Sequence, residues 1–319
     1  MLLRISKSEA LTSDIRLIRL QPLDGVMLPS FEPGAHVGLT LRLGDEVAYR
    51  KYSLVSDGGT GSHYDIAVKR NANGRGGSAH LHDGLTVGDQ VEVSAPASEF
   101  GLAADVAHHV LVAGGIGITP MLGMASRLRQ SGASYELHYS GAGATEMAFL
   151  DELTREHGDA IHLYFTREGA DATRRIDVEA LVERHRDEAD THFYVCGPAR
   201  LIDNVRLAAE ARGIARRRVH FESFGPAWAA TDGPVRVVLS ESAIDVEVQP
   251  GTTLLDAMEG AGAWIPSECR RGECGACITT YTGGRPIHRD NCLTEEQRKH
   301  SFCPCVSWAA SDETLTLQA

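Results

Sequence analysis

The sequence predicts a multidomain chain of three parts: an antiparallel β-barrel, an α/β domain with a parallel sheet, and a small α+β domain. Three observations support this. Short, partly alternating apolar runs separated by Gly, Pro, Asp and Asn fill the first hundred residues. From about residue 108, apolar strands alternate with helical segments. Six of the seven cysteines lie between Cys269 and Cys305, so the last part carries a chemistry of its own.

The first part is expected to be all-β. Its runs have the length and spacing of strands that close into an antiparallel barrel. The strands are predicted at Arg16–Leu20, His36–Leu41, Lys51–Val55, Tyr64–Lys69 and Gln90–Ser94.

The second part reads as strand, helix, strand in regular order. This order predicts a parallel sheet with a nucleotide-type crevice at the carboxyl ends of its strands. Strands are predicted at His109–Ala113, Tyr135–Tyr139, Ile161–Phe165 and His192–Cys196. Helices are predicted from Gly117 to about Gln130, around Glu146–Glu156, around Asp177–Asp187 and at Ala199–Arg212.

The segment PAWAATDGP, from Pro226 to Pro234, interrupts this pattern and predicts a linker. After it we expect a hairpin of Val235–Leu239 and Ile244–Val248, a helix at Thr253–Gly262 and a last strand at Thr314–Leu317. The predicted domains are therefore residues 1–102, 103–226 and 235–319, with a linker at 227–234.

Composition limits the class of partner. The 319 residues carry a net charge of −12, which disfavours a phosphate backbone and suits a basic protein partner. The N-terminus shows no signal peptide, and no stretch approaches 18 apolar residues. We therefore expect no nucleic acid, no membrane span and a cytoplasmic protein, in which a disulfide framework would not persist.

The strongest motif is the cysteine loop CRRGECGAC, residues 269–277. Cys269, Cys274 and Cys277 have the C-x4-C-x2-C spacing of plant-type ferredoxins, whose fourth cysteine lies further along the chain. Two irons and two sulfides need four soft thiolates, and glycines let the loop turn tightly so that backbone N–H groups face the sulfurs. The fourth ligand could be Cys292, Cys303 or Cys305, those not used being packed thiols. Zinc is the alternative, although its usual second C-x2-C pair is missing.

A flavin is indicated by two segments of the barrel. Arg50, Lys51, Tyr52 and Ser53 offer a cation for a phosphate, an aromatic ring for stacking and a hydroxyl near the reactive ring edge. The segment GRGGS, residues 74–78, precedes a short helical stretch and combines glycine amides with a hydroxyl, as anion sites do. Each alone could be an ordinary barrel strand or a glycine-rich turn; together they favour flavin.

A pyridine nucleotide is indicated by two further segments. GGIGITP, residues 114–120, follows a strand and opens a helix, so its glycines could let a pyrophosphate approach. Cys196, Gly197 and Pro198 end a later strand at the same sheet edge. A tight strand-to-helix turn and a buried small Cys196 are the competing interpretations. Because no base is near Cys196 in the sequence, no nucleophile is proposed.

Taken together, the motifs resemble those of the phthalate dioxygenase reductase and vanillate O-demethylase reductase family, the class IA reductases of Rieske oxygenases. The similarity covers almost the whole chain in the family's domain order. The matching strings are RKYSL, VKRNANGRGGS, VAGGIGITPML, YVCGP, HFESF, CRRGECGAC, HRD and CVS.

The resemblance implies FMN, a [2Fe–2S] cluster and NADH as cofactors, a ferredoxin-reductase-like core, a β-grasp ferredoxin domain, a monomer and a Rieske oxygenase as protein partner. It selects Cys305, in the CVS string, as the fourth cluster ligand. The cofactor-binding residues it implies, together with those of the nucleotide motifs, are Arg50, Lys51, Tyr52, Ser53, Val68, Lys69, Gly76, Gly77, Ser78, Gly114, Gly115, Gly117, Ile118, Thr119, Cys196, Gly197, Pro198 and Phe224.

The chain departs from the family in one loop. Where many relatives carry an arginine before the A-F-x-x-E-L stretch, this chain has Gly141-Ala142-Gly143-Ala144, so NADPH stays an alternative to NADH. The motifs predict a relay: hydride passes from the nucleotide to the flavin, and single electrons pass on to the cluster without an acid or base from the protein. A cytochrome P450 as acceptor, or a redox-sensing iron–sulfur flavoprotein, are the alternative functions.

Overall fold

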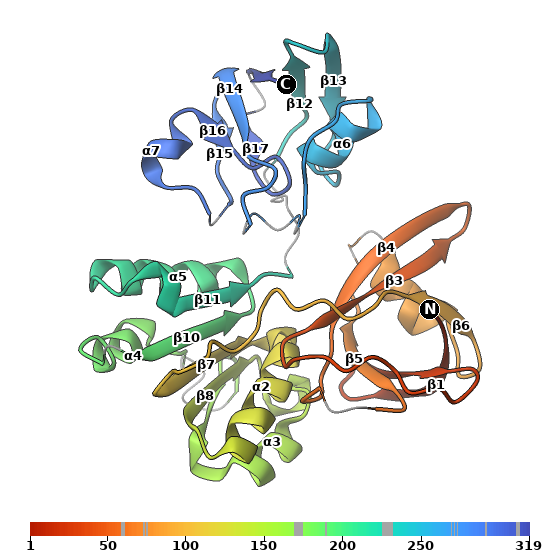
Figure 1. The fold of residues 1–319 in the computed structure, drawn as a ribbon, viewed down its shortest axis with the longest axis vertical. Coiled ribbons are helices and arrows are strands. Elements are labelled where there is room, and N and C mark those ends of the chain that lie inside the picture. The colour runs from red at the N-terminus through yellow and green to blue at the C-terminus, as the bar shows by residue number, and fades with distance from the viewer. Residues whose placement is uncertain are drawn as a thin grey trace. The chain divides into compact units, whose positions relative to one another are not determined.

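The computed structural model describes residues 1–58, 61–72, 74, 76–168, 175–188, 190–224, 232–268, 270, 272, 274–290, 292–310 and 313–319. The chain forms two compact units, Met1–Phe224 and Gly225–Ala319 (Figure 1). Most of the predicted linker, 227–234, lies outside the described residues. Among the helices that the structure describes, none has the length and apolar composition needed to cross a membrane.

The first unit begins with the predicted antiparallel barrel. Its sheet has the order β4-β3-β6-β1-β2-β5, and a bridge between Leu54 and Ile66 joins the end of β4 to β5, so that the sheet closes on itself. Apolar side chains from alternate positions fill its interior. The strands are β1 (Leu2–Ala10), β2 (Ile15–Pro22), β3 (His36–Leu43), β4 (Glu46–Ser53), β5 (Tyr64–Lys69) and β6 (Gln90–Val93).

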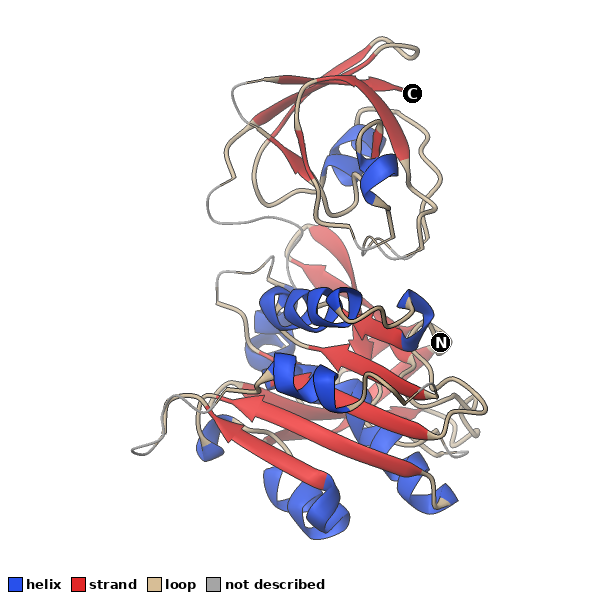
Figure 2. Ribbon diagram, turned by 90° about the vertical axis from the view of Figure 1, so that its left-hand side faces the viewer, coloured by secondary structure: helices blue, strands red, loops and turns tan. Residues whose placement is uncertain are grey.

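The same unit continues with the predicted α/β domain. Its sheet has the order β11-β10-β7-β8-β9, and every pair is parallel. Helices cover both faces, α2 and α3 on one and α4 and α5 on the other (Figure 2). The strands are β7 (His108–Gly114), β8 (Ser134–Gly141), β9 (Ile161–Phe165), β10 (Thr191–Cys196) and β11 (Val219–Glu222). The helices are α2 (Ile118–Ser131), α3 (Leu150–His157), α4 (Val178–Arg184) and α5 (Ala199–Ala211).

The helix predicted around Glu146–Glu156 is shorter than expected. The chain forms a single 3-10 turn at Ala144–Glu146, and α3 begins only after Phe149, whose φ is 62°. Met147 and Ala148, between them, are almost fully buried. The positive φ of Phe149 lies in the left-handed region, which a right-handed helix does not contain, so a continuous helix cannot pass through this residue.

The barrel and the α/β domain are joined through α2. A Cβ atom on Gly123 would lie 2.2 Å from the carbonyl oxygen of Ser56, so only glycine lets the helix approach the chain after β4 this closely. Arg127 also donates to the carbonyl oxygen of Asp57 at 2.8 Å. This contact holds the end of β4, with its flavin motif, beside the helix that carries the nucleotide motif.

The second unit has the β-grasp arrangement expected of a plant-type ferredoxin domain. Its sheet has the order β13-β12-β18-β14-β16, in which only β12 and β18 are parallel. Trp308 and Phe302 lie in its core. The strands are β12 (Val235–Leu239), β13 (Ile244–Val248), β14 (Thr279–Gly283), β15 (Pro286–Ile287), β16 (Ser301–Phe302), β17 (Trp308–Ala309) and β18 (Thr314–Gln318); the helices are α6 (Leu254–Gly260) and α7 (Glu295–Arg298).

Candidate electron-transfer sites

The nucleotide motif forms a tight turn at the carboxyl edge of the parallel sheet. Strand β7 ends at Gly114, residues Gly115–Gly117 form one 3-10 turn, and α2 begins at Ile118. A Cβ atom on Gly117 would lie 2.2 Å from the carbonyl oxygen of Cys196. The turn therefore packs directly against the end of β10, and the structure brings the two predicted nucleotide segments together.

Other residues of the two nucleotide segments pack tightly around this turn. A Cβ atom on Gly114 would lie 2.7 Å from Cδ of Pro198, and Gly197 has a φ of 157°. The hydroxyl of Thr119 donates to the carbonyl oxygen of Ile116 at 2.9 Å, which fixes the first turn of α2. Cys196 is fully buried, as the interpretation of a small packed side chain expects. The narrow turn leaves the backbone N–H groups of α2 as the polar groups suited to a pyrophosphate.

The flavin motif on β4 is divided between the two faces of the strand. Arg50 and Tyr52 lie on one face, whereas Ser53 lies on the other. Tyr52 packs against the barrel core, and burial raises the pKa of its phenol to about 12 against the opposing charge of Arg50, so the hydroxyl is neutral at physiological pH. Lys51, on the second face, lies 3.6 Å from Glu99.

The glycine-rich segment meets Arg50. A Cβ atom on Gly77 would lie 2.9 Å from Cγ of Arg50, so the arginine side chain packs directly against this glycine. Gly76 has a φ of 76°, and the hydroxyl of Ser78 accepts from the backbone N–H of Asn71 at 3.0 Å. The helix that begins here, α1, covers only Gly77–Ala79, so its dipole is small. Anion binding would therefore depend on Arg50 and individual N–H groups.

Three further residues predicted to bind the flavin differ in burial and in their contacts. Val68 is buried, and its carbonyl oxygen lies 2.8 Å from Nε2 of His82. The ammonium of Lys69 pairs with Asp14 at 3.1 Å. Phe224 follows β11 and is partly exposed, with 43% of its surface accessible.

Glu222 is a site residue that the sequence analysis did not single out. It ends β11 beside Cys196 of β10 and is only 1% exposed. Its carboxylate accepts a hydrogen bond from the hydroxyl of Ser53 at 3.4 Å, across the junction between barrel and sheet. No local signal marks it, because HFESF also contains other polar residues and Ser53 lies 169 residues away in the sequence. The contact orients the Ser53 hydroxyl and joins the two cofactor segments.

The cysteine loop belongs to the second unit. The Sγ atoms of Cys277 and Cys305 lie 3.2 Å apart and both residues are buried, whereas Cys274 is exposed and its sulfur accepts from the N–H of Ala276 at 3.4 Å. Cys269 lies outside the described residues. Two buried thiols at this separation suit ligands of one iron, and the N–H contact is the kind that stabilises a negatively charged cluster.

Close packing and ion pairs fix the cysteine loop against the rest of the second unit. Gly272 has a φ of 73°, and a Cβ atom there would lie 2.5 Å from Val306, the neighbour of Cys305. Arg270, with a φ of 53°, pairs with Asp256 at 2.7 Å and Glu259 at 2.6 Å on α6. The described residues therefore fit a plant-type cluster.

The other two cysteines lie beside the cluster loop. The Sγ atoms of Cys292 and Cys303 lie 3.5 Å apart, and the fully buried thiol of Cys303 also contacts that of Cys277. The buried carboxylate of Asp290 accepts from the backbone N–H of Leu293 at 3.2 Å and lies 3.4 Å from the hydroxyl of Ser307. The HRD string and the CVS string thus support each other beside the cluster loop.

Comparison with known proteins identifies the three parts. The domain family described as "Oxidoreductase FAD-binding domain" matches residues 2–101, the "Oxidoreductase NAD-binding domain" matches residues 111–207, and the "2Fe-2S iron-sulfur cluster binding domain" matches residues 237–310. These matches cover the barrel, the parallel sheet and the cysteine loop.

Similar proteins share the whole arrangement. The phthalate dioxygenase reductase of Burkholderia cepacia is 37% identical over 98% of this chain and 96% of its own. A solved structure of a protein of that name superposes with a TM-score of 0.77 and 35% identity, over 100% of this chain and 98% of that one. The chain belongs to this reductase family.

Another similar protein is named for a different enzyme system. The heme-dependent oxidative N-demethylase beta subunit of Ectopseudomonas mendocina (strain ymp) is 39% identical over 95% of this chain and 94% of its own length. Members of the family are reductase components of oxygenase systems. This protein is accordingly an oxidoreductase with a flavin domain, an NAD-binding domain and a [2Fe–2S] domain, as the sequence predicted.

Proposed function

We propose that this protein takes hydride from NADH, passes electrons through FMN and the [2Fe–2S] cluster, and delivers them to an oxygenase of the Rieske type. Two contacts at one junction carry the first half of this proposal. The Ser53–Glu222 contact and the packing of Gly117 on Cys196 bring the flavin strand and the nucleotide turn to one junction. A nicotinamide bound at the turn would therefore lie beside a flavin bound at the strand.

The protein's own groups bind and orient, and none is required to transfer a proton. The amides after Gly114 would hold the pyrophosphate of the nucleotide, Arg50 the flavin phosphate, and the four predicted cysteines, Cys269, Cys274, Cys277 and Cys305, the cluster. When bound, flavin and cluster supply the conversion of a two-electron donor into single electrons. Buried Thr119, Cys196 and Glu222 exclude water from the junction.

NADH is favoured over NADPH by the loop that departs from the family pattern. The N–H of Ala144 donates to the carboxylate of Glu168 at 2.9 Å, and a Cβ atom on Gly143 would lie 3.0 Å from that carboxylate. An acid that already occupies a loop amide repels an additional phosphate. This loop would face the adenosine half of the nucleotide, so the 2′-phosphate of NADPH would meet Glu168.

The proposed relay is tested by anaerobic mixing of the purified holoprotein with NADH in a stopped-flow spectrophotometer. Both the flavin absorbance and the cluster absorbance are expected to bleach, and NADPH is expected to react at least about tenfold less efficiently. Catalytic reduction of cytochrome c should follow. Bleaching of the flavin alone would contradict the transfer to the cluster, and absence of turnover would favour a redox sensor.

Replacement of Arg50 by alanine is expected to release the flavin. Hydrogen bonds to charged groups contribute about 1.5–3 kcal/mol, so flavin affinity should fall about 10- to 100-fold. Flavin binding is measured by fluorescence titration of the apoprotein, and mass spectrometry of the flavin released by heat tests FMN against FAD. Arg42→Ala, on the neighbouring strand β3, removes an exposed arginine and is the matched control. Equal flavin affinities of the two variants would contradict the role of Arg50.

The acceptor has a second candidate, a heme protein. The relative from Ectopseudomonas mendocina is named as a subunit of a heme-dependent N-demethylase, so this reductase architecture occurs beside heme as well as in phthalate dioxygenase. Purified oxygenase components of both kinds distinguish the candidates. We expect NADH-driven reduction of the Rieske cluster to be faster than reduction of a P450 heme; the reverse order would identify the heme protein as acceptor.

We further propose a cytoplasmic monomer. Cys277, Cys292 and Cys303 are reduced thiols, which is the state that cluster assembly needs and that a reducing compartment maintains. Size-exclusion chromatography with light scattering is the test of the monomer.

A further inference from the structure

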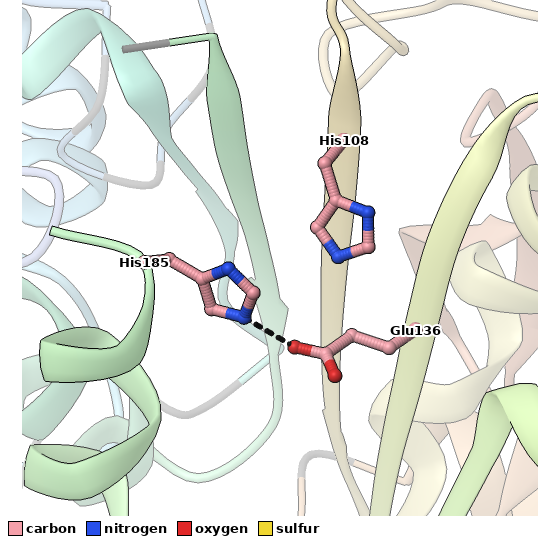
Figure 3. Close-up of side chains that lie close together, drawn as sticks. All are labelled: His108, Glu136 and His185. Atoms are coloured by element: carbon pink, nitrogen blue, oxygen red, sulfur yellow. Dashed lines mark hydrogen bonds and ion pairs between the residues drawn. The ribbon is translucent and has the colours of Figure 1, made fainter. Parts of the chain in front are cut away.

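A second cluster of metal-binding side chains lies in the first unit, away from all the residues discussed so far. His108 begins β7, Glu136 lies near the start of β8, and His185 follows α4. Figure 3 shows the two imidazole rings and the carboxylate pointing into one space between these three elements. One ligand atom from each lies within 4.8 Å of the others.

Both histidines are oriented as metal ligands usually are. Nδ1 of His185 bonds to the carboxylate of Glu188 at 2.8 Å, and Nδ1 of His108 bonds to the hydroxyl of Ser134 at 2.7 Å. In metal sites the ring nitrogen that does not bind the ion is commonly held by a carboxylate or another oxygen in this way. Since Nδ1 of each ring is already bonded, Nε2 is the atom that can bind an ion beside Glu136. Nε2 of His185 lies 2.7 Å from the carboxylate of Glu136.

The cluster also contains an unsatisfied nitrogen atom. Nε2 of His108 is buried and has no hydrogen-bond partner among the described residues. Buried polar atoms are rarely left without a partner, so this atom calls for an explanation. His138, only 3% exposed, faces the same carboxylate, and its Nε2 pairs with Glu136 at 3.4 Å. An unpartnered imidazole nitrogen beside a carboxylate that other histidines already contact indicates that a cation belongs there.

We propose that His108, Glu136 and His185 bind a divalent transition-metal ion of the zinc type. Two imidazoles and a carboxylate, with a water molecule as fourth ligand, form a known zinc donor set. Ligand atoms of a tetrahedral zinc ion lie about 3.3 Å apart, so small side-chain rotations close the present separation. His138 is the nearest additional ligand.

Arg184 is the group that competes with this ion. Its guanidinium lies 2.9 Å from both carboxylate oxygens of Glu136, and its Nε lies 3.3 Å from Nε2 of His185. About half of its side chain, 53%, is exposed, so it can turn into solvent when an ion arrives. In the absence of metal the arginine balances the charge of this partly buried carboxylate. Removing it should therefore increase the affinity for the ion.

The site is independent of the proposed function. His108 is the first residue of β7, whereas the nucleotide turn follows its last residue, Gly114; at about 3.3 Å per residue the two are roughly 20 Å apart. The ion would link the end of α4 to β7 and β8 and thereby stabilise the native state. The rate of flavin reduction by NADH should not depend on it.

The test is addition of one equivalent of zinc chloride to the holoprotein, after loosely bound metal has been removed, followed by zinc K-edge X-ray absorption and isothermal titration. We expect one zinc ion per chain with nitrogen and oxygen ligands at about 2.0 Å. A shell of sulfur at about 2.3 Å would place the zinc on cysteines and overturn the proposal. Because the iron edge lies at a different energy, the [2Fe–2S] cluster does not interfere.

Variants assign the ion to these residues. His108→Gln and His185→Gln should each weaken zinc binding by about tenfold or more, and Arg184→Ala should strengthen it. His300→Gln, which replaces an exposed histidine of the second unit, is the matched control and should bind as the wild type does. His108→Gln loses the contact to Ser134 and the stacking of its ring on His185, whereas His185→Gln also loses the bonds to Glu136 and Glu188. His108→Gln is therefore expected to fold even if His185→Gln does not. Unchanged affinity in His108→Gln would overturn the assignment.

Discussion

Replacing Cys305 with serine is expected to cut NADH-driven reduction of a one-electron protein acceptor by at least about a hundredfold, because a hydroxyl is a poor substitute for a soft thiolate on iron. Sγ of Cys305 lies 3.2 Å from Sγ of Cys277, close enough for both to bind one iron. Iron content and cluster absorbance should fall with it. Reduction of the flavin by NADH should change by less than about threefold, since the flavin and nucleotide segments belong to the other compact unit.

Cys303→Ser is the matched control for this experiment. Cys303 precedes Cys305 by two residues, is equally buried and also contacts Cys277, but it lies outside the CVS string and its sulfur is 3.5 Å from Cys292. We expect this variant to keep two irons per chain and most of the output to the acceptor. If Cys303→Ser loses the cluster and Cys305→Ser keeps it, the assignment of the fourth ligand is wrong.

Local patterns in the sequence were sufficient for much of the fold. The strands Tyr64–Lys69, Ile161–Phe165 and Ile244–Val248 have the predicted bounds, because each is a compact apolar or alternating run ended by turn residues. Strand β1, Leu2–Ala10, was not predicted, since after Ile5 the segment SKSEA has only one apolar residue and shows no alternation. The two-residue strands around the cysteine loop carry no periodicity and depend on tertiary packing.

The same holds for the candidate site: parts with a local sequence pattern were predicted, and parts that depend on tertiary contacts were not. Segments with their own chemical signature, such as GGIGITP and CRRGECGAC, are predictable from their residues alone, and the fold brings the two nucleotide segments together. Glu222 was missed because its partner Ser53 is 169 residues away, and nothing local marks a carboxylate that joins two domains. The cluster of His108, Glu136 and His185 was missed for the same reason, because three separate elements contribute to it.

Replacement of Gly117 by alanine is expected to damage nucleotide binding more than any other single methyl group added to the first unit. The φ of Gly117 is −63°, a value open to every residue, so the effect would be purely steric. The new Cβ atom would lie 2.2 Å from the carbonyl oxygen of Cys196, 2.4 Å from its carbonyl carbon and 2.7 Å from the backbone nitrogen of Gly197. All three are backbone atoms of the facing segment, which no side-chain rotation can move away.

The turn and the end of β10 must therefore separate, which should cost about 1–3 kcal/mol of folding stability and raise KM for NADH about tenfold or more while flavin remains bound. Steady-state kinetics and thermal unfolding measure the two effects. The variant Gly132→Ala separates the effect on stability from the effect on KM. Gly132 follows the last residue of the same helix, α2, with a φ of 69°, and a Cβ atom added there would have no neighbour within 4 Å. Its left-handed backbone should cost about 1–2 kcal/mol without touching the turn. If both variants lose stability but KM stays unchanged in each, the turn around Gly117 does not bind the nucleotide.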